Sequence, residues 1–142
     1  MSTGCSRTVR LEPLYRLVFR YPEPFRAGDE LLLLAEGRSE GRLTGRFRGA
    51  NRARRREDGT WVPDLQGAVV TDDGATVLLH LTGRGSPRAE PVGRVVAAVT
   101  HVCADERYSW LDGAVCAVAG EVREGREIVL DVAELVWEPL RP

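Results

Sequence analysis

Short runs in which apolar and polar residues alternate recur along the chain. Leu14–Tyr21 is the clearest of them, and Arg42–Arg48 repeats the pattern with one polar face. A period of two is typical of a β-strand, because successive side chains point to opposite faces. We expect Pro22 and Pro24 to end the first strand, and Gly37–Gly41 to form the turn that leads into the Arg42–Arg48 strand.

One turn sequence between two such runs predicts a β-hairpin. The segments Gln66–Thr71 and Ala75–Thr82 flank an Asp-Asp-Gly sequence, and Asp-Gly between β-rich runs is typical of tight hairpins. Further strands are predicted in the three apolar runs that follow, Arg94–Ala104, Ser109–Val122 and Glu127–Trp137. The polar, Arg-rich segment Ala50–Asp64 reads as a long loop or a hairpin tip.

The order of these elements predicts the fold class. About eight short strands without a convincing amphipathic helix favour an all-β protein, namely a small closed antiparallel β-barrel with an internal cavity. A β-sandwich is the structural alternative. We expect residues 1–142 to form one such domain, with residues 1–10 as a frayed N-terminus. The Ser109–Val122 run is apolar on both faces, which indicates a possible homodimer interface.

Composition narrows the classes of partner. The 142 residues are 43% apolar and 29% charged with a formal net charge of -1, so no overall field favours nucleic acid or an anionic membrane. No apolar segment approaches the roughly 20 residues that span a bilayer, and no signal peptide is evident, so we expect a cytoplasmic protein. The three cysteines form no Cys-x-x-Cys pair, and we expect neither a metal site nor a cofactor.

Three sequence elements resemble one known family. They are Leu11-Glu12-Pro13-Leu14-Tyr15, then Thr71-Asp72-Asp73-Gly74-Ala75 leading to Thr82-Gly83, then Arg107-Tyr108-Ser109-Trp110-Leu111. In this order and spacing, from about Leu11 to Val136, the chain resembles the domain-of-unknown-function family 3237. The resemblance implies a small antiparallel barrel with an internal cavity, and it implies no particular activity. The chain departs from the pattern in the Arg-rich segment Gly49–Pro63 and at Asp112, where Asn is common.

Three titratable residues are candidates for acid/base catalysis. His80 shares a strand face with Thr76, Leu78 and Thr82, and its imidazole is suited to a general base near neutral pH. A solvent-facing or hydrogen-bonded structural histidine is the more common interpretation of such a position. Asp64 lies near Trp61, where partial burial would raise its pKa, although Asp in this context often caps a turn. Tyr108 is the third candidate.

Aromatic side chains are the candidates for substrate binding. Tyr15, Trp61, Trp110 and His101 offer flat rings with large contact areas, although core packing explains such residues equally well. His101 and Cys103 lie two residues apart and would share a face of a strand, as two ligands of a zinc ion would. No standard zinc spacing accompanies them, so a buried thiol is the better interpretation.

Two functions fit this pattern. The first is a cofactor-independent acid/base enzyme, of the cyclase, isomerase or lyase type, that acts on a partly hydrophobic small molecule inside the barrel. The second is a non-catalytic carrier that binds a hydrophobic small molecule through its aromatic residues. A protein that acts only through oligomerisation is a third possibility.

Overall fold

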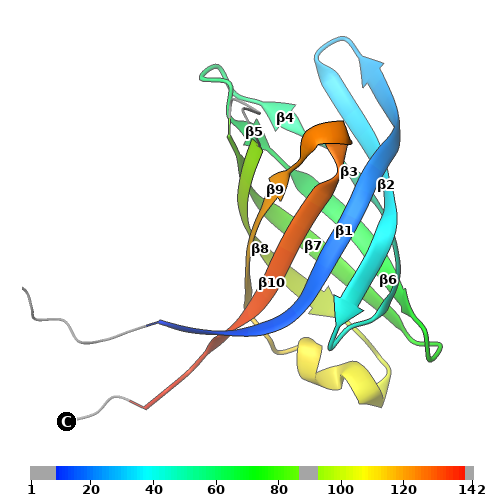
Figure 1. The fold of residues 1–142 in the computed structure, drawn as a ribbon, viewed down its shortest axis with the longest axis vertical. Helices are drawn as coiled ribbons and strands as arrows, with labels where there is room; N and C mark the ends of the chain where they lie inside the picture. Colours follow the sequence, from blue (N-terminus) through cyan, green and yellow to red (C-terminus); the bar gives the residue numbers. More distant parts are fainter. Residues whose placement is uncertain (1–8, 87–92, 140–142) are drawn as a thin grey trace, which may run out of the picture.

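The computed structural model describes residues 9–86 and 93–139, and eight of its strands form a closed antiparallel barrel (Figure 1). In order around the barrel, the strands are β7 (Thr76–Gly85), β6 (Asp64–Thr71), β3 (Gly45–Asn51), β2 (Glu30–Gly41), β1 (Arg10–Ala27), β10 (Ile128–Val136), β9 (Cys116–Val122) and β8 (Gly93–Val102). Pairing of β8 with β7 closes the ring. The predicted fold class is therefore confirmed, and most of the segment predicted as a frayed N-terminus lies outside the described residues.

Alternation of inward and outward side chains separates the core from the surface, most clearly along β7. On β7, Val77, Leu79 and Leu81 point inward and are buried, whereas Leu78 and His80 between them are exposed. Phe47 from β3 is fully buried at the centre of the barrel. The predicted β6–β7 hairpin is confirmed, with Val70 paired to Thr76 across its turn.

The first two strands are longer than the sequence predicted. β1 continues through Pro22 and Pro24 to Ala27, with a register shift against β2 between Arg20 and Glu23. Beyond Phe19, β1 pairs with β2 alone, because its pairing with β10 ends there. Proline is tolerated at bulges and along unpaired edges, where its missing N–H leaves no ladder hydrogen bond unmade. The expectation that the prolines end the strand is therefore wrong.

The expected turn at Gly37–Gly41 is also wrong, because β2 runs through this segment. Gly37 serves a different purpose: a Cβ atom there would lie 2.0 Å from the carbonyl oxygen of Val18 on β1. Only glycine permits such a close approach of two backbones. The chain reverses after Gly41 instead, where the Thr44 hydroxyl donates a hydrogen bond of 2.8 Å to the Gly41 carbonyl oxygen.

A short helix stands where the sequence predicted the beginning of a strand. Residues Glu106–Leu111 form the 3-10 helix η1, and β9 begins only at Cys116. The carboxylate of Asp105 accepts a hydrogen bond from the backbone N–H of Arg107 and so caps this helix. Leu111 is fully buried under the lower end of the barrel, so η1 closes that end (Figure 1).

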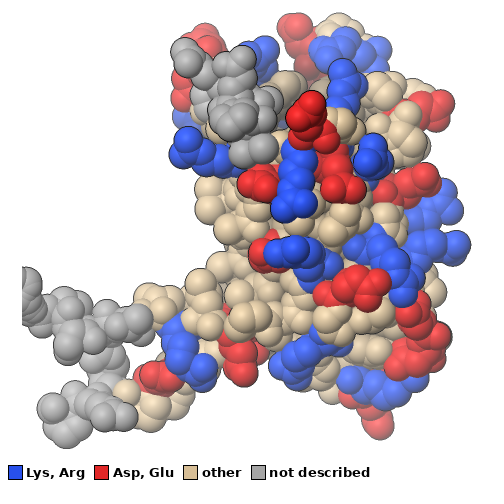
Figure 2. All heavy atoms as spheres, in the orientation of Figure 1, with Lys and Arg blue, Asp and Glu red and all other residues tan. Residues whose placement is uncertain are grey.

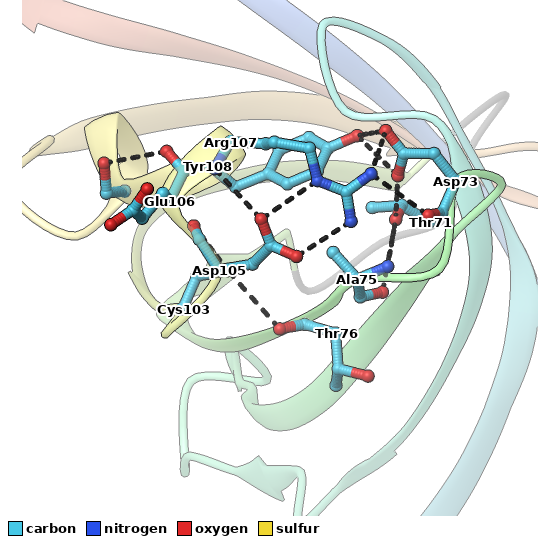
Figure 3. A network of polar contacts seen from close by, with 10 residues as sticks. Thr71, Asp73, Ala75, Thr76, Cys103, Asp105, Glu106, Arg107 and Tyr108 are labelled. Carbon is cyan, nitrogen blue, oxygen red and sulfur yellow. Dashed lines mark hydrogen bonds and ion pairs between the residues drawn. The ribbon is translucent and has the colours of Figure 1, made fainter.

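Polar contacts join η1 to the β6–β7 turn (Figure 3). The Arg107 guanidinium donates hydrogen bonds to Asp105 and to the backbone carbonyl oxygen of Asp73, and the Tyr108 hydroxyl donates to the Asp73 carboxylate at 3.0 Å. The Thr71 hydroxyl donates to the same carboxylate, and this bond is the main cause of the lowered pKa of Asp73. Exposed pairs of this kind contribute little to stability on their own, so they orient η1 while Leu111 anchors it.

Charged side chains cover much of the outer surface. Figure 2 shows basic and acidic residues intermixed on the face formed by β1, β2 and β10. Arg16 and Asp131 form one of these pairs at 2.7 Å across β1 and β10. Among residues 9–86 and 93–139, no helix is long and apolar enough to cross a membrane.

Candidate ligand-binding cavity

A cavity of about 300 Å³ occupies the end of the barrel opposite η1. Its wall is largely apolar and combines bulky side chains with glycines; the bulky ones include Phe19, Leu31, Leu65, Leu81, Ile128 and Leu130. The two-residue strands β4 (Arg54–Arg55) and β5 (Trp61–Val62) form a small hairpin beside this end, attached to β7 through the pairing of Trp61 with Gly85. The glycines Gly85 on β7 and Gly93 on β8 also line the cavity.

One hydrogen-bonded pair provides the polar side chains deep in the wall. The Asn51 amide nitrogen donates to the Tyr21 hydroxyl oxygen at 2.9 Å, while the Asn51 amide oxygen accepts from the backbone N–H of Asp64 at 2.9 Å. The Asn51 side chain is therefore held in one orientation. Within the described part of the chain, the Tyr21 O–H has no acceptor of its own, so its proton is available to a ligand. Burial raises the pKa of Tyr21, which keeps the hydroxyl protonated and able to donate.

Of the seven residues predicted to form a site, Trp61 lines the cavity. It begins β5, within the segment predicted to be a loop or hairpin tip, and its ring forms part of the cavity rim.

The predicted catalytic residues His80 and Asp64 lie together on the outer face of the barrel. The His80 Nε2 atom is 2.7 Å from the Asp64 Oδ1 atom, and each side chain is about half exposed, at 49% and 51%. Gln66, on the same outer face, is the direct cross-strand neighbour of His80. A ligand inside the cavity is thus separated from both groups by the barrel wall.

Tyr108 and Trp110 lie on η1, at the closed end. Tyr108 bonds Asp73, and Trp110 stacks under the Arg42 guanidinium with 4.1 Å between the guanidinium carbon and the ring centroid. Neither residue lines the cavity. Trp110 falls within the segment predicted as a strand from Ser109, and the 3-10 helix takes the place of the start of that strand.

Tyr15 and His101 form a buried pair in the lower half of the barrel. The Tyr15 hydroxyl oxygen lies 2.7 Å from the His101 Nε2 atom, with the two rings edge to face. Burial lowers the pKa of His101 to about 4 and raises that of Tyr15, so both side chains are neutral near pH 7. Among the residues that the structure describes, the His101 Nδ1 atom has no hydrogen-bond partner.

Metal binding gains no support from this geometry. His101 and Cys103 are both buried, but the Cys103 thiol donates to the backbone carbonyl oxygen of Thr76 and His101 pairs with Tyr15. Cys103 and Cys116 are buried free thiols. In residues 9–86 and 93–139, no group of three or more His, Cys, Asp or Glu side chains is arranged to hold a metal ion.

Sequence reasoning missed Tyr21 and Asn51. Tyr21 carried a usable signal, because alternation along the first strand places it on the same face as the buried Leu17 and Phe19. Asn51 carried none: it ends β3 but was assigned to a loop, and only the barrel brings it beside Tyr21.

These features define a closed eight-stranded antiparallel β-barrel with a cavity at one end. No family model matches the sequence, and no curated protein does. Solved structures do share the fold. A β-barrel-like protein from Acinetobacter baumannii AYE is 21% identical with a TM-score of 0.82, and the match covers 94% of this chain and 100% of that one.

Two further structures extend the comparison. A conserved protein of unknown function from Rhodopseudomonas palustris is 18% identical with a TM-score of 0.81, over 93% of this chain and 100% of the other. An enzyme from Penicillium herquei is 22% identical with a TM-score of 0.66, over 94% of this chain and 100% of the other. At these identities the similarity establishes the fold alone.

Proposed function

We propose that this protein binds a small, partly hydrophobic molecule in the barrel cavity. The observation that carries the proposal is the combination of an apolar wall with one oriented hydrogen-bond donor, the Tyr21 hydroxyl. A volume of about 300 Å³ lies at the lower end of the range of roughly 300–1,000 Å³ that is usual for small-molecule sites.

Each part of the site has a distinct role in this proposal. The apolar wall provides the affinity, because moving apolar surface out of water is favourable at about 25 cal/mol per Å². Tyr21 provides orientation, since its free O–H can bond a carbonyl or hydroxyl oxygen of the ligand, and Asn51 holds Tyr21 in place. We also infer membership of family 3237, which the barrel fold and the cavity support.

Acid/base catalysis in the same cavity is the second candidate, and the free Tyr21 hydroxyl is the observation that favours it. A buried O–H aimed at a substrate oxygen stabilises negative charge that develops there, as cyclisation, isomerisation or elimination requires. The Penicillium herquei enzyme shows that this fold occurs in an enzyme. The catalytic roles of His80, Asp64 and Tyr108 stay predictions, and none of the three touches a ligand bound in this cavity.

Binding can be tested with the neutral dye N-phenyl-1-naphthylamine, whose fluorescence increases in apolar surroundings. Val95 and Val96 offer a matched pair of variants, because Val95 lines the cavity whereas Val96 points outward and is 62% exposed. We expect Val95→Trp to abolish dye binding and Val96→Trp to leave it unchanged. Equal binding by both variants would contradict the proposal, since the dye would then lie elsewhere.

The carrier and the enzyme differ in what happens to a bound molecule. Native mass spectrometry of the purified protein, followed by denaturing analysis, identifies any small molecule that co-purifies. Incubating that molecule with the protein then separates the two: a carrier returns it unchanged, whereas an enzyme converts it. If the protein is an enzyme, we expect Tyr21→Phe to slow turnover at saturating substrate. If it is a carrier, we expect the same substitution to reduce only the affinity for the ligand.

A further inference from the structure

The β4–β5 hairpin places one arginine on the same face as Trp61, which lines the cavity. In an antiparallel pair, directly opposed residues point to the same face, and Arg55 is opposed to Trp61 whereas Arg54 is opposed to Val62. Because Trp61 lines the cavity, Arg55 lies on the cavity side of the hairpin. Its guanidinium carbon is 5.7 Å from the centroid of the Trp61 ring, within the range of a cation–π contact.

Within residues 9–86 and 93–139, Arg55 has no carboxylate partner, whereas seven other arginines pair with Asp or Glu. Arg52, three residues earlier, pairs with Glu30, and Arg107 pairs with Asp105. Arg55 forms neither an ion pair nor a hydrogen bond with any side chain in residues 9–86 and 93–139, and its guanidinium lies over the Trp61 ring. The Asp58 carboxylate nearby in sequence accepts a hydrogen bond from the Thr60 N–H instead.

The charges of the cavity wall are compatible with a negatively charged ligand. Among the described residues that line it, none is Asp or Glu, so no fixed negative charge opposes an anion. Arg94 is the charged residue among them. It lies on the outward face of β8, and Glu121 is its direct cross-strand neighbour on β9. The Tyr21 hydroxyl adds a donor inside. The polar side chains of the wall also include those of Asn51 and Ser86, and none of them carries a negative charge.

From this arrangement we propose that the ligand is an organic anion, whose acid group binds Arg55 at the rim while its apolar body lies against Trp61 inside the cavity. The inference rests on the proposed small-molecule function and specifies its ligand class. A guanidinium donates two parallel hydrogen bonds to a carboxylate or sulfonate, and Trp61 keeps this guanidinium beside the cavity.

Two dyes that differ by one acid group test the proposal. The probe 8-anilinonaphthalene-1-sulfonate carries a sulfonate on the same aromatic skeleton as neutral N-phenyl-1-naphthylamine. Arg55→Gln is the test variant, and Arg54→Gln is its matched control, because it removes the same charge from the adjacent position on the other face of the hairpin. Dissociation constants are measured by fluorescence titration at fixed ionic strength.

We expect Arg55→Gln to weaken binding of the sulfonate dye about tenfold, as the loss of a charge-assisted hydrogen bond does, and to leave the neutral dye unaffected. Arg54→Gln should change neither dye by more than about twofold. Equal weakening of the sulfonate dye by both variants would overturn the proposal in favour of a general effect of net charge, and so would no weakening at all. Failure of the neutral dye to bind wild-type protein would instead contradict the proposed cavity function itself.

Discussion

Acid should destabilise this protein through His101 before it affects the carboxylates. His101 is 3% exposed, its Nε2 atom lies against the Tyr15 hydroxyl, and its Nδ1 atom has no partner in the described part of the chain. A proton added to this ring creates a buried charge with an N–H that no acceptor meets. Asp112 attracts that charge, but this effect is smaller than the cost of desolvation, which lowers the pKa to about 4.

The sign and size of the effect follow from the two pKa values. The pKa of His101 is about 4 in the folded protein against 6.5 for an unperturbed histidine, so between these values the unfolded chain binds more protons. The free energy of unfolding therefore falls as the pH decreases from about 6.5 to 4, by about 3 kcal/mol in total, with about 2 kcal/mol already lost at pH 5. Asp105, whose pKa is lowered to about 2, affects the free energy of unfolding in a more acidic pH range.

Urea unfolding of wild-type protein and of His101→Gln at pH 7, 6 and 5 measures this loss. Glutamine can still pair with the Tyr15 hydroxyl but takes up no proton, so its stability should vary less over this range whatever its value at pH 7. His80→Gln is the control, because His80 is about half exposed and should leave the wild-type dependence intact. Identical pH dependence in wild type and His101→Gln, or a His101 ring that titrates near pH 6.5 by NMR, would refute the reasoning.

Four further substitutions test how the barrel is built. Leu111→Ala should cost about 3 kcal/mol in urea unfolding, because Leu111 is fully buried and anchors η1. Arg107→Gln, on the same helix, should shift the urea midpoint little, since its ion pairs are exposed. Gly37→Ala should cost about 3 kcal/mol in the same assay, because its Cβ would collide with the β1 backbone, whereas Gly113→Ala, with nothing within 4 Å, should be tolerated. Equal midpoints for the two glycine variants would contradict the close approach.

The β6–β7 hairpin and the closed barrel were predictable because their signals are local. A turn sequence between two alternating runs needs no knowledge of the rest of the chain. The length of β1 was not predictable in this way, since Pro22 and Pro24 are tolerated only because β10 stops pairing at Phe19. Likewise, the segment that forms η1 has aromatic residues two positions apart, a spacing that is typical of one face of a strand. The Asp105 carboxylate instead caps this segment as a 3-10 helix.

The site was harder to predict than the fold, because alternation defines two faces without saying which one lines a cavity. The apolar face of β7 points inward, and this alone places His80 outside. Tyr21 and Asn51 are 30 residues apart in sequence and lie on different strands, so their hydrogen bond depends on the geometry of the barrel. The homodimer inferred from the apolar β9 segment stays a prediction.

The size of inward side chains along the barrel axis explains why one end is packed and the other hollow. Leu17, Phe47 and Val99 fill the middle with almost no exposure, whereas the inward positions near the open end include Gly85 and Gly93. Phe19, Leu65 and Leu130 belong both to the cavity wall and to the hydrophobic core, so truncating them should weaken folding as well as binding. Val95 lines the cavity but is only partly buried, so a substitution there should alter ligand affinity at a smaller cost to folding.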